Sequence, residues 1–212
     1  MTLYRPTHFR VDDEAALLAF IEAHGFGTLV SARARGLDVS HIPFVPERGP
    51  DGRIRLLAHV ARANAQWEAL AEATHVVAIF EGPHAYVSPT WYAEHPSVPT
   101  WNYAVVHAHG RARLMDEAGL RALLERLSRT YEEGRPNAWR LSAQPEEYVA
   151  KMLRAIVGFE LEVERLEGKF KLSQNRPAEI PRVIAALEAQ GQSELADLMR
   201  LHTPKPKSKI TP

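Results

Sequence analysis

The chain has 212 residues, and its 45% hydrophobic and 25% charged residues are typical of a globular protein with a buried core. Lys and Arg together number 26, as do Asp and Glu, so the chain lacks the basic excess of a dedicated DNA-binding protein. Cysteine is absent, which excludes disulfides and thiolate metal sites.

The chain shows no membrane or export signal. No apolar run approaches the roughly 20 residues that a membrane-spanning helix needs. Charged residues interrupt the N-terminal segment within a few positions, unlike the apolar core of a signal peptide. We therefore expect a cytoplasmic protein.

The first third of the chain predicts one helix followed by three strands. Asp12 or Asp13 caps a helix that ends at Gly25. The expected strands are separated by glycine-containing turns and run from Phe26 to Arg33, from Leu37 to Glu47 and from Arg53 to His59.

The middle of the chain predicts a short helix from Asn64 to Ala73 and then two strands, Thr74 to Glu81 and His84 to Ser88, joined by Gly82-Pro83. The connection that follows, residues 87–103, contains two of the four tryptophans, two tyrosines and three prolines. Prolines stiffen a connection, and this one offers aromatic rings, hydroxyls and an amide. It suits a flat, partly polar aromatic ligand, or it closes the end of a β-barrel.

The last part predicts a strand from Tyr103 to Met115, a helix from Asp116 and a helix from Pro145 to about Ala155. Between Phe159 and Glu164, apolar residues alternate with glutamates, which is typical of a half-buried strand with one solvated face. A helix ends at Gly191, and another runs from Ser193 to His202.

Many short strands with a few helices between them predict an α+β fold built on a mostly antiparallel barrel. We expect a main domain over residues 1–175, a C-terminal helical hairpin packed on it over 176–202, and a disordered Pro/Lys-rich tail over 203–212.

Two stretches carry a resemblance to a known family: residues 87–103 and residues 59–67, His-Val-Ala-Arg-Ala-Asn-Ala-Gln-Trp. Shorter matches lie at residues 4–9, 26–30, 40–43, 82–86 and 171–175. Together they resemble the PaiB-type family, FMN-binding proteins described as negative transcriptional regulators. The resemblance implies the flavin-binding split barrel, pyridoxamine phosphate oxidase-like, in which two subunits build each FMN site. Ala65 departs from the family pattern, which usually has proline after Asn64.

The FMN phosphate calls for a guanidinium group and for backbone amides at the start of a helix. Arg62, followed by Asn64 at an expected helix N-cap, offers both within three residues, and His59 could add a donor. A surface salt bridge for Arg62 and a backbone contact for His59 are the alternatives.

The flavin ring calls for main-chain groups along its polar edge and for an aromatic wall. The resemblance places the ring along the second strand, and the candidate residues are Val39, Ser40, His41, Trp101, Asn102, Lys171, Ser173 and Gln174. Lys171 would stabilise negative charge at the N1–O2 edge, although a solvated lysine at a strand end is the alternative. The segment of Lys171 to Gln174 is expected after a turn at Gly168 and resembles one that crosses onto the neighbouring subunit's flavin.

Other motifs are weak. His107-Ala-His109 has a spacing that can bind a metal, but no carboxylate sits at a matching offset. The sequence therefore predicts paired polar surface and no metal site. It shows no phosphate-binding glycine loop and no nucleophile elbow, so the chain supplies no catalytic residue of its own that the sequence identifies.

Three functions compete. The resemblance implies a homodimeric flavin or redox sensor that represses transcription, although direct DNA binding is doubtful for a chain with no net charge. The alternatives are an FMN-dependent oxidoreductase or flavin reductase acting on a small molecule, and a haem-binding split barrel.

Overall fold

The computed structural model describes residues 3–33, 36–72 and 75–203. These residues form two compact units. The larger unit comprises residues 13–80 and 106–167, and the smaller unit comprises 3–12, 81–105 and 168–203 of the described chain. The predicted disordered tail falls almost entirely on residues 204–212, outside the described residues.

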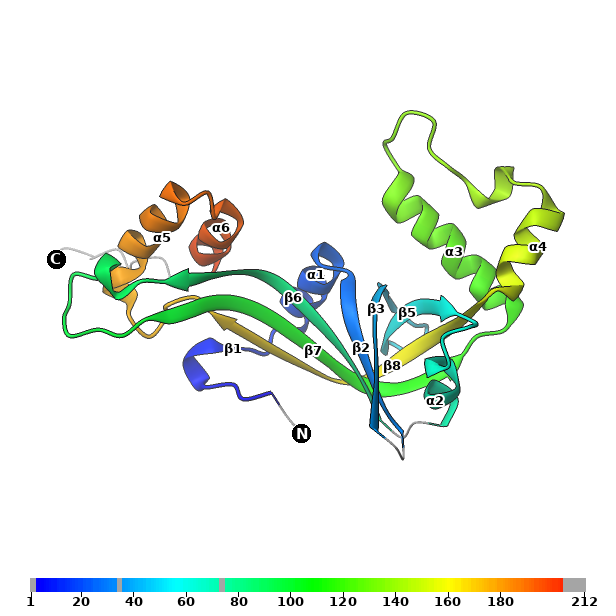
Figure 1. Ribbon diagram of the computed structural model, residues 1–212, viewed down its shortest axis with the longest axis horizontal. Coiled ribbons are helices and arrows are strands. Elements are labelled where there is room, and N and C mark those ends of the chain that lie inside the picture. Colours follow the sequence, from blue (N-terminus) through cyan, green and yellow to red (C-terminus); the bar gives the residue numbers. More distant parts are fainter. Residues whose placement is uncertain (1–2, 34–35, 73–74, 204–212) are drawn as a thin grey trace. The chain divides into compact units, whose positions relative to one another are not determined.

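The larger unit contains most of the secondary structure (Figure 1). Its helices are α1 (Glu14–Ala23), α2 (Gln66–Glu72), α3 (Glu117–Glu132) and α4 (Glu146–Arg154). Its complete strands are β2 (Phe26–Arg33), β3 (Gly36–Pro43), β4 (Val45–Arg48) and β5 (Ile54–Ala61). Three longer strands contribute residues to both units: β6 (Val76–Val87), β7 (Thr100–Leu114) and β8 (Ile156–Lys171).

The strands of the larger unit follow the order β3-β2-β6-β7-β8-β5-β4. The pairs β2–β3, β2–β6, β4–β5 and β5–β8 are antiparallel. The predicted α+β class with a mostly antiparallel sheet is thus confirmed. Two hairpins close on glycines at positive φ, Gly36 at 144° and Gly52 at 79°, where other residues are strained. The sheet order leaves β3 at one end, which matters for the site.

The core of the larger unit joins helices to the sheet. Phe44 packs edge-to-face on Phe80, with ring centroids 5.3 Å apart. A second cluster buries the apolar stripe of α3 against β4, β5 and α4, and comprises Val45, Leu57, Leu120, Leu123, Leu127, Leu141, Val149 and Leu153. Asp116 accepts a hydrogen bond from Gly119 N at 2.8 Å and caps α3, as the sequence predicts.

The smaller unit contains β1 (Arg10–Val11), which pairs antiparallel with β8 through Arg10↔Lys169 and Val11↔Gly168. It also contains α5 (Ile180–Ala189) and α6 (Ser193–His202), two contacting helices that are orange to red in Figure 1. Both helices lie where the sequence predicts them. In the described part of the chain, no helix combines the length and apolar character needed to cross a membrane.

Three local predictions are wrong. The predicted strand from Leu37 to Glu47 is two strands, β3 and β4, at opposite ends of the strand order. The break falls at Phe44, which is buried and donates its backbone N–H to Gly25 O at 2.8 Å. Burying this ring turns the chain out of β3.

Gly82-Pro83 does not separate two strands, because β6 is continuous from Val76 to Val87. Strand β2 pairs with β6 only through Val76–Ile79, so Pro83 lies beyond that ladder and its missing N–H costs no bond to β2. Gly168 likewise lies inside β8 and makes no turn, since Val11 pairs with it.

Candidate functional site

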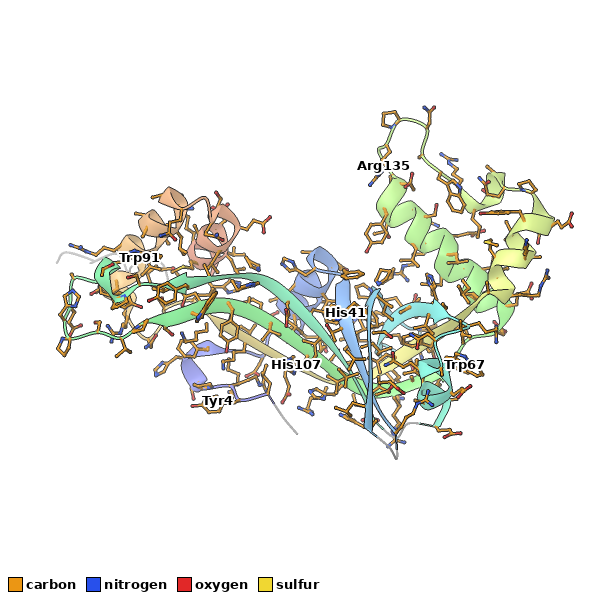
Figure 2. All side chains as sticks on the ribbon, in the orientation of Figure 1. Tyr4, His41, Trp67, Trp91, His107 and Arg135 are labelled. Atoms are coloured by element: carbon orange, nitrogen blue, oxygen red, sulfur yellow. The ribbon has the colours of Figure 1, made fainter. Side chains whose placement is uncertain are left out.

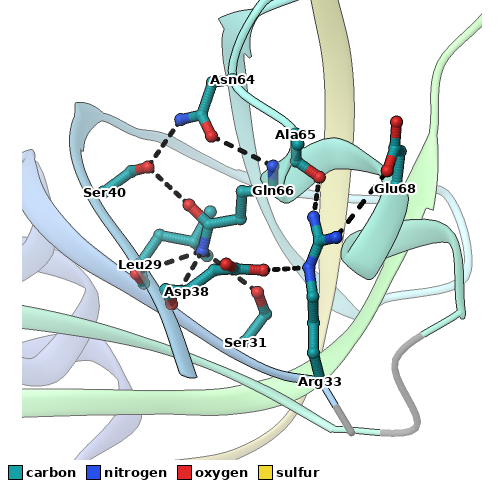
Figure 3. Close-up of polar contacts among 9 residues, drawn as sticks. All are labelled: Leu29, Ser31, Arg33, Asp38, Ser40, Asn64, Ala65, Gln66 and Glu68. Atoms are coloured by element: carbon teal, nitrogen blue, oxygen red, sulfur yellow. Dashed lines mark hydrogen bonds and ion pairs between the residues drawn. The ribbon is translucent and has the colours of Figure 1, made fainter. Parts of the chain in front are cut away.

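A buried amide organises the edge of the sheet in the larger unit. Gln66, at the start of α2, is 2% exposed. Its Nε2 donates to Ser31 Oγ at 3.1 Å and to Asp38 O at 3.2 Å, and its Oε1 accepts from Ser40 Oγ (Figure 3). These bonds satisfy a group that would otherwise be costly to bury, and they hold α2 on the β2–β3 hairpin.

Asn64 and Ser40, two of the predicted site residues, belong to this network. Asn64 Nδ2 donates to Ser40 Oγ at 2.8 Å, and Asn64 Oδ1 accepts from Gln66 N at 3.0 Å (Figure 3). Asn64 therefore supports the beginning of α2, as predicted. Arg33 links the same segments, because its guanidinium forms ion pairs with Asp38 and Glu68 and donates to the carbonyl of Ala65. The polar side chains of Ser40 and Asn64 thus bind each other and position the backbone around them.

Strand β3 has an outer edge that pairs with no other strand in the described part of the chain. Being at the end of the strand order, it has one pairing partner, β2. Alternate backbone groups on its other edge are therefore available, which is what a flavin ring's polar edge needs. Val39 is 54% exposed, and the exposed His41 places Nδ1 3.0 Å from Thr28 Oγ1. Figure 2 labels His41 on this strand.

Arg62 is tied to the end of α4. Its Nε donates to Arg154 O at 2.8 Å and its Nη2 to Ile156 O at 3.2 Å, so it satisfies carbonyls where α4 passes into β8. The guanidinium also lies 5.9 Å from the ring of Trp67, which is labelled in Figure 2. The alternative for Arg62, a surface salt bridge, is absent among its described contacts, and the side chain remains exposed.

His59, on β5, has a buried ring nitrogen without a partner. Its Nδ1 makes no hydrogen bond within the described chain. Burial lowers the pKa of His59 below its ordinary value, because the charged ring is poorly solvated there. An unsatisfied buried nitrogen is costly, and a ligand atom is one way to satisfy it.

The end of β8 places two lysines, Lys169 and Lys171, in the smaller unit. Lys171 Nζ donates to Thr100 Oγ1 at 2.5 Å and to Trp101 O at 2.6 Å. Lys169 is 8% exposed, and its Nζ lies 5.1 Å from the ring of Tyr4 and 5.4 Å from that of Tyr103. Burial, together with the charge of Lys169, lowers the pKa of Lys171. These hydrogen-bond and ring contacts of both lysines are to neutral groups.

The other predicted residues of this unit make local contacts. The buried Asn102 donates through Nδ2 to Ser173 Oγ at 2.9 Å, and Ser173 adopts a φ of 67°. Gln174 accepts from Leu172 N at 2.7 Å and donates to Phe170 O at 2.6 Å. These three side chains fix the turn that follows β8.

Trp101 borders a groove of about 330 Å³ in the smaller unit. His84 and Tyr103 also line it, and the Trp101 ring centroid lies 6.3 Å from that of His84. The volume is at the lower end of small-molecule sites. Larger hollows of about 590 and 840 Å³ lie beside α3, but neither contains a predicted site residue.

The predicted residues therefore divide between the units. Val39, Ser40, His41, His59, Arg62 and Asn64 lie in the larger unit, and Trp101, Asn102, Lys171, Ser173 and Gln174 lie in the smaller one. Ser40 contacts Asn64, and Asn102 contacts Ser173. Sequence reasoning missed Gln66 and Lys169. Residues 167–170 of β8 are all buried, so the alternation seen between Phe159 and Glu164 gives no signal for Lys169.

The two histidines of β7 are not a paired surface, which corrects the sequence prediction. His109 is 3% exposed, and its Nε2 lies 3.0 Å from Glu167 Oε2 on β8. The carboxylate missing from the local sequence is thus supplied by another strand. Burial lowers the pKa of His109, as does the charge of Arg165, while the hydrogen bond to Glu167 opposes this change.

Comparison with known proteins identifies the family. Residues 3–165 match the family model described as "Putative FMN-binding domain". The chain is also 30% identical over 209 residues to the Bacillus subtilis "Protease synthase and sporulation protein PAI 2", covering 98% of this chain and 100% of that protein. The chain belongs to the PaiB-type FMN-binding family.

Solved structures agree on the fold. The flavocytochrome Anf3 from Azotobacter vinelandii matches with a TM-score of 0.62 and 19% identity, covering 79% of this chain and 72% of that one. The FAD and haem binding protein from Mycobacterium smegmatis matches with a TM-score of 0.57 and 18% identity, covering 76% and 73%. The predicted mostly antiparallel split-barrel fold of flavin-binding proteins is confirmed. FMN is the cofactor that the family match gives for this PaiB-type protein.

Each unit offers groups that suit part of that cofactor. FMN combines a doubly charged phosphate with a flat ring, and phosphate is held by cations and N–H donors. In the larger unit, Nδ1 of the buried His59 has no hydrogen-bond partner among the described residues. In the smaller unit, Lys171 Nζ is held by two neutral oxygens, Thr100 Oγ1 and Trp101 O.

Proposed function

We propose that this PaiB-type protein is a homodimeric flavin or redox sensor that lowers gene expression. The observation that carries the proposal is the end-to-end similarity to PAI 2 of Bacillus subtilis, whose name links that protein to protease synthesis and sporulation. When bound, FMN supplies reversible one- and two-electron transfer. The cytoplasmic location expected from the sequence is part of this proposal.

We assign the cofactor contacts by chemical need. His59 and Arg62, with the backbone at Asn64, serve the phosphate, and the outer edge of β3 at Val39–His41 serves the polar edge of the ring. Lys171 holds its charge against neutral partners, Thr100 Oγ1 and Trp101 O, which suits it to an electron-rich ring edge. Ser173 and Gln174 shape the turn that presents it, and Asn102 anchors that turn.

Homodimerisation is supported by an exposed apolar face. Phe26 and Leu37 are 67% and 69% exposed, and the β2–β3 register puts them on the same face as Val39. An apolar surface of this kind is typical of a protein–protein contact. The partner of the proposed dimer is a second copy of this chain.

The visible spectrum of the purified protein is the first test. Flavin bands, with FMN identified by mass after release, support the proposal, and a reporter strain lacking the gene should then show raised expression of its target. A Soret band would favour haem, which the flavocytochrome neighbours bind according to their names. Rapid NAD(P)H consumption with a small-molecule acceptor would favour the oxidoreductase instead.

Arg62→Ala tests the phosphate assignment. We expect FMN binding to weaken by about 1.5–3 kcal/mol, the range for a hydrogen bond to a charged group, while riboflavin binding changes little. Comparing the two ligands matters because Arg62 also holds the end of α4. Damage to the fold would weaken both ligands equally, and that result would contradict the assignment.

A further inference from the structure

Two strands of the larger unit bring three metal-binding side chains together. His107 and His109 are two residues apart on β7 and so share a face, and Glu167 reaches them from β8. One ligand atom from each residue lies within 4.8 Å of the others. Figure 2 labels His107 on its strand.

The two buried members already have the spacing of neighbouring ligands. His109 Nε2 and Glu167 Oε2 are 3.0 Å apart. Two atoms that each bind one ion at about 2.1 Å lie roughly 3.0–3.4 Å from each other. His107 is half-buried, and one of its ring nitrogens already lies within 4.8 Å of the ligand atoms of the other two residues.

Outer contacts orient both buried ligands. His75 Nε2 lies 3.2 Å from His109 Nδ1, and Arg165 forms an ion pair with the second carboxylate oxygen of Glu167. A metal-binding histidine usually donates its other ring N–H to such a partner, and ligating carboxylates are themselves held. If His109 donates through Nδ1 to His75, its Nε2 lone pair faces a carboxylate oxygen. Two such acceptors at 3.0 Å need either a proton or a metal cation between them.

We propose that His107, His109 and Glu167 bind one divalent transition-metal ion, separately from the flavin site. Two imidazoles and one carboxylate suit Zn²⁺ and its transition-metal neighbours, whereas Mg²⁺ and Ca²⁺ prefer oxygen ligands. Three protein ligands leave a position open to water or to an exogenous ligand. This site is independent of the proposed sensor function, because none of its residues serves FMN there.

The competing arrangement is a metal-free hydrogen-bonded chain. In it, His75 Nε2–H donates to His109 Nδ1, and His109 Nε2–H donates to Glu167. This chain does not need His107, whereas the metal site does. His107→Gln therefore separates the two arrangements.

Zn²⁺ titration by calorimetry tests the proposal on the full-length flavoprotein after EDTA treatment. We expect one saturable Zn²⁺ per chain and no binding of Mg²⁺ under the same conditions. His107→Gln and Glu167→Gln should each weaken Zn²⁺ by about 100-fold or more, since losing a ligand exceeds the 10–100-fold effect of losing an outer-shell partner. His75→Gln should weaken it by about 10–100-fold, and His8→Gln, which changes an exposed histidine outside the cluster, should leave it unchanged.

Thermal unfolding with and without Zn²⁺ provides a second measurement if Glu167→Gln folds poorly. Zn²⁺ should raise the Tm of the wild type and of His8→Gln, and leave the Tm of His107→Gln unmoved. The proposal is overturned if the wild type shows no saturable Zn²⁺ site, or if Zn²⁺ binds His107→Gln as tightly as the wild type.

Discussion

The contribution of His59 to the stability of the folded chain should depend on pH. Burial lowers the pKa of His59 below its ordinary value of 6.5, so the folded chain protonates the ring less readily than the unfolded chain does. Below about pH 6.5 the unfolded chain therefore gains more from protonation, and the stability that the neutral ring contributes is complete above that pH and is lost as pH falls.

We therefore expect the free energy of unfolding, measured by urea denaturation from pH 8 to pH 5, to decrease below about pH 6.5. His59→Gln should make that decrease shallower, because glutamine has no proton to bind. His202 also has a pKa lowered by burial, so some slope should remain. An unchanged slope in the variant would show that His59 does not contribute.

At the residue scale, predictability depended on whether partners were close in sequence. Asp13 and Asp116 cap helices as predicted, because each needs only an amide three residues ahead. Glu167 was missed, because the alternation of buried and exposed residues in β8 breaks down before it and residues 167–170 are all buried. Its partner His109 is 58 residues away, and no local pattern reveals that contact.

At the element scale, the Trp- and Pro-rich connection is held by the start of α5. Glu179 accepts from Ala93 N and Glu94 N, with distances of 3.0–3.1 Å. Arg176 donates to Ser97 Oγ at 2.8 Å and lies 4.9 Å from the ring of Tyr92. The stiffness expected from prolines is therefore reinforced by a carboxylate from a distant segment.

Glu179→Gln should loosen this connection. The backbone N–H groups hold the pKa of Glu179 below its ordinary value, so its contribution exists above about pH 4.5 and is lost on acidification. At pH 7 we expect the amides of Ala93 and Glu94 to exchange about tenfold faster in the variant. Glu194→Gln, which changes an exposed carboxylate on α6, is the control. If the amides of Ala93 and Glu94 exchange equally fast in both variants, Glu179 does not stabilise the connection.

Elements were predictable where local signals agree with packing. Strand β2 and helix α6 have the predicted bounds, and α1, α3 and α5 begin and end within a few residues of them. The prediction of one strand from Leu37 to Glu47 was wrong because the buried Phe44 divides it into β3 and β4. The prediction of a break at Gly82-Pro83 was wrong because β6 makes no backbone hydrogen bonds to β2 at that point, so proline does not interrupt the strand. Both causes are tertiary, so propensity does not reveal them.

At the scale of the whole molecule, the exposed face of the β2–β3 hairpin predicts self-association. We expect the wild type to sediment as a dimer at micromolar concentration, and Leu37→Glu to shift it toward monomer by placing a charge on that face. Leu201→Glu changes a leucine of α6 that is 78% exposed and should leave the dimer intact. A monomeric wild type that still binds FMN would contradict the homodimer.

The candidate site was predictable only in its chemistry. The sequence and the family resemblance predicted cations, main-chain groups of the second strand and aromatic rings, and the family match confirms FMN. It did not predict that Arg62 also holds the end of α4, or that Lys169 lies between Tyr4 and Tyr103. These contacts join segments far apart in the chain, so they follow from the fold and not from spacing.

Direct binding to DNA is the last question at this scale. The chain has 26 basic and 26 acidic residues, and a homodimer keeps the same balance. Helix α6 would be the second helix of a helix-turn-helix, but its Arg200 is bound by Asp197 at 2.8 Å and by Glu188 of α5. Leu195, Ala196 and Met199 are buried, so the face of α6 that remains exposed carries Glu194 and Asp197, which is unfavourable for entering a DNA groove.

We therefore expect micromolar or weaker, non-specific DNA binding at physiological salt, and repression that acts through a partner protein or a small molecule. The basic cluster is Lys205, Lys207 and Lys209, so a chain truncated before Thr203 should lose most of the binding that fluorescence anisotropy detects. Replacing the three lysines by glutamine in the full-length chain is the matched control and should have the same effect. Nanomolar binding to one sequence that survives the truncation and moderate salt would overturn this expectation and make α5 and α6 a DNA-reading element.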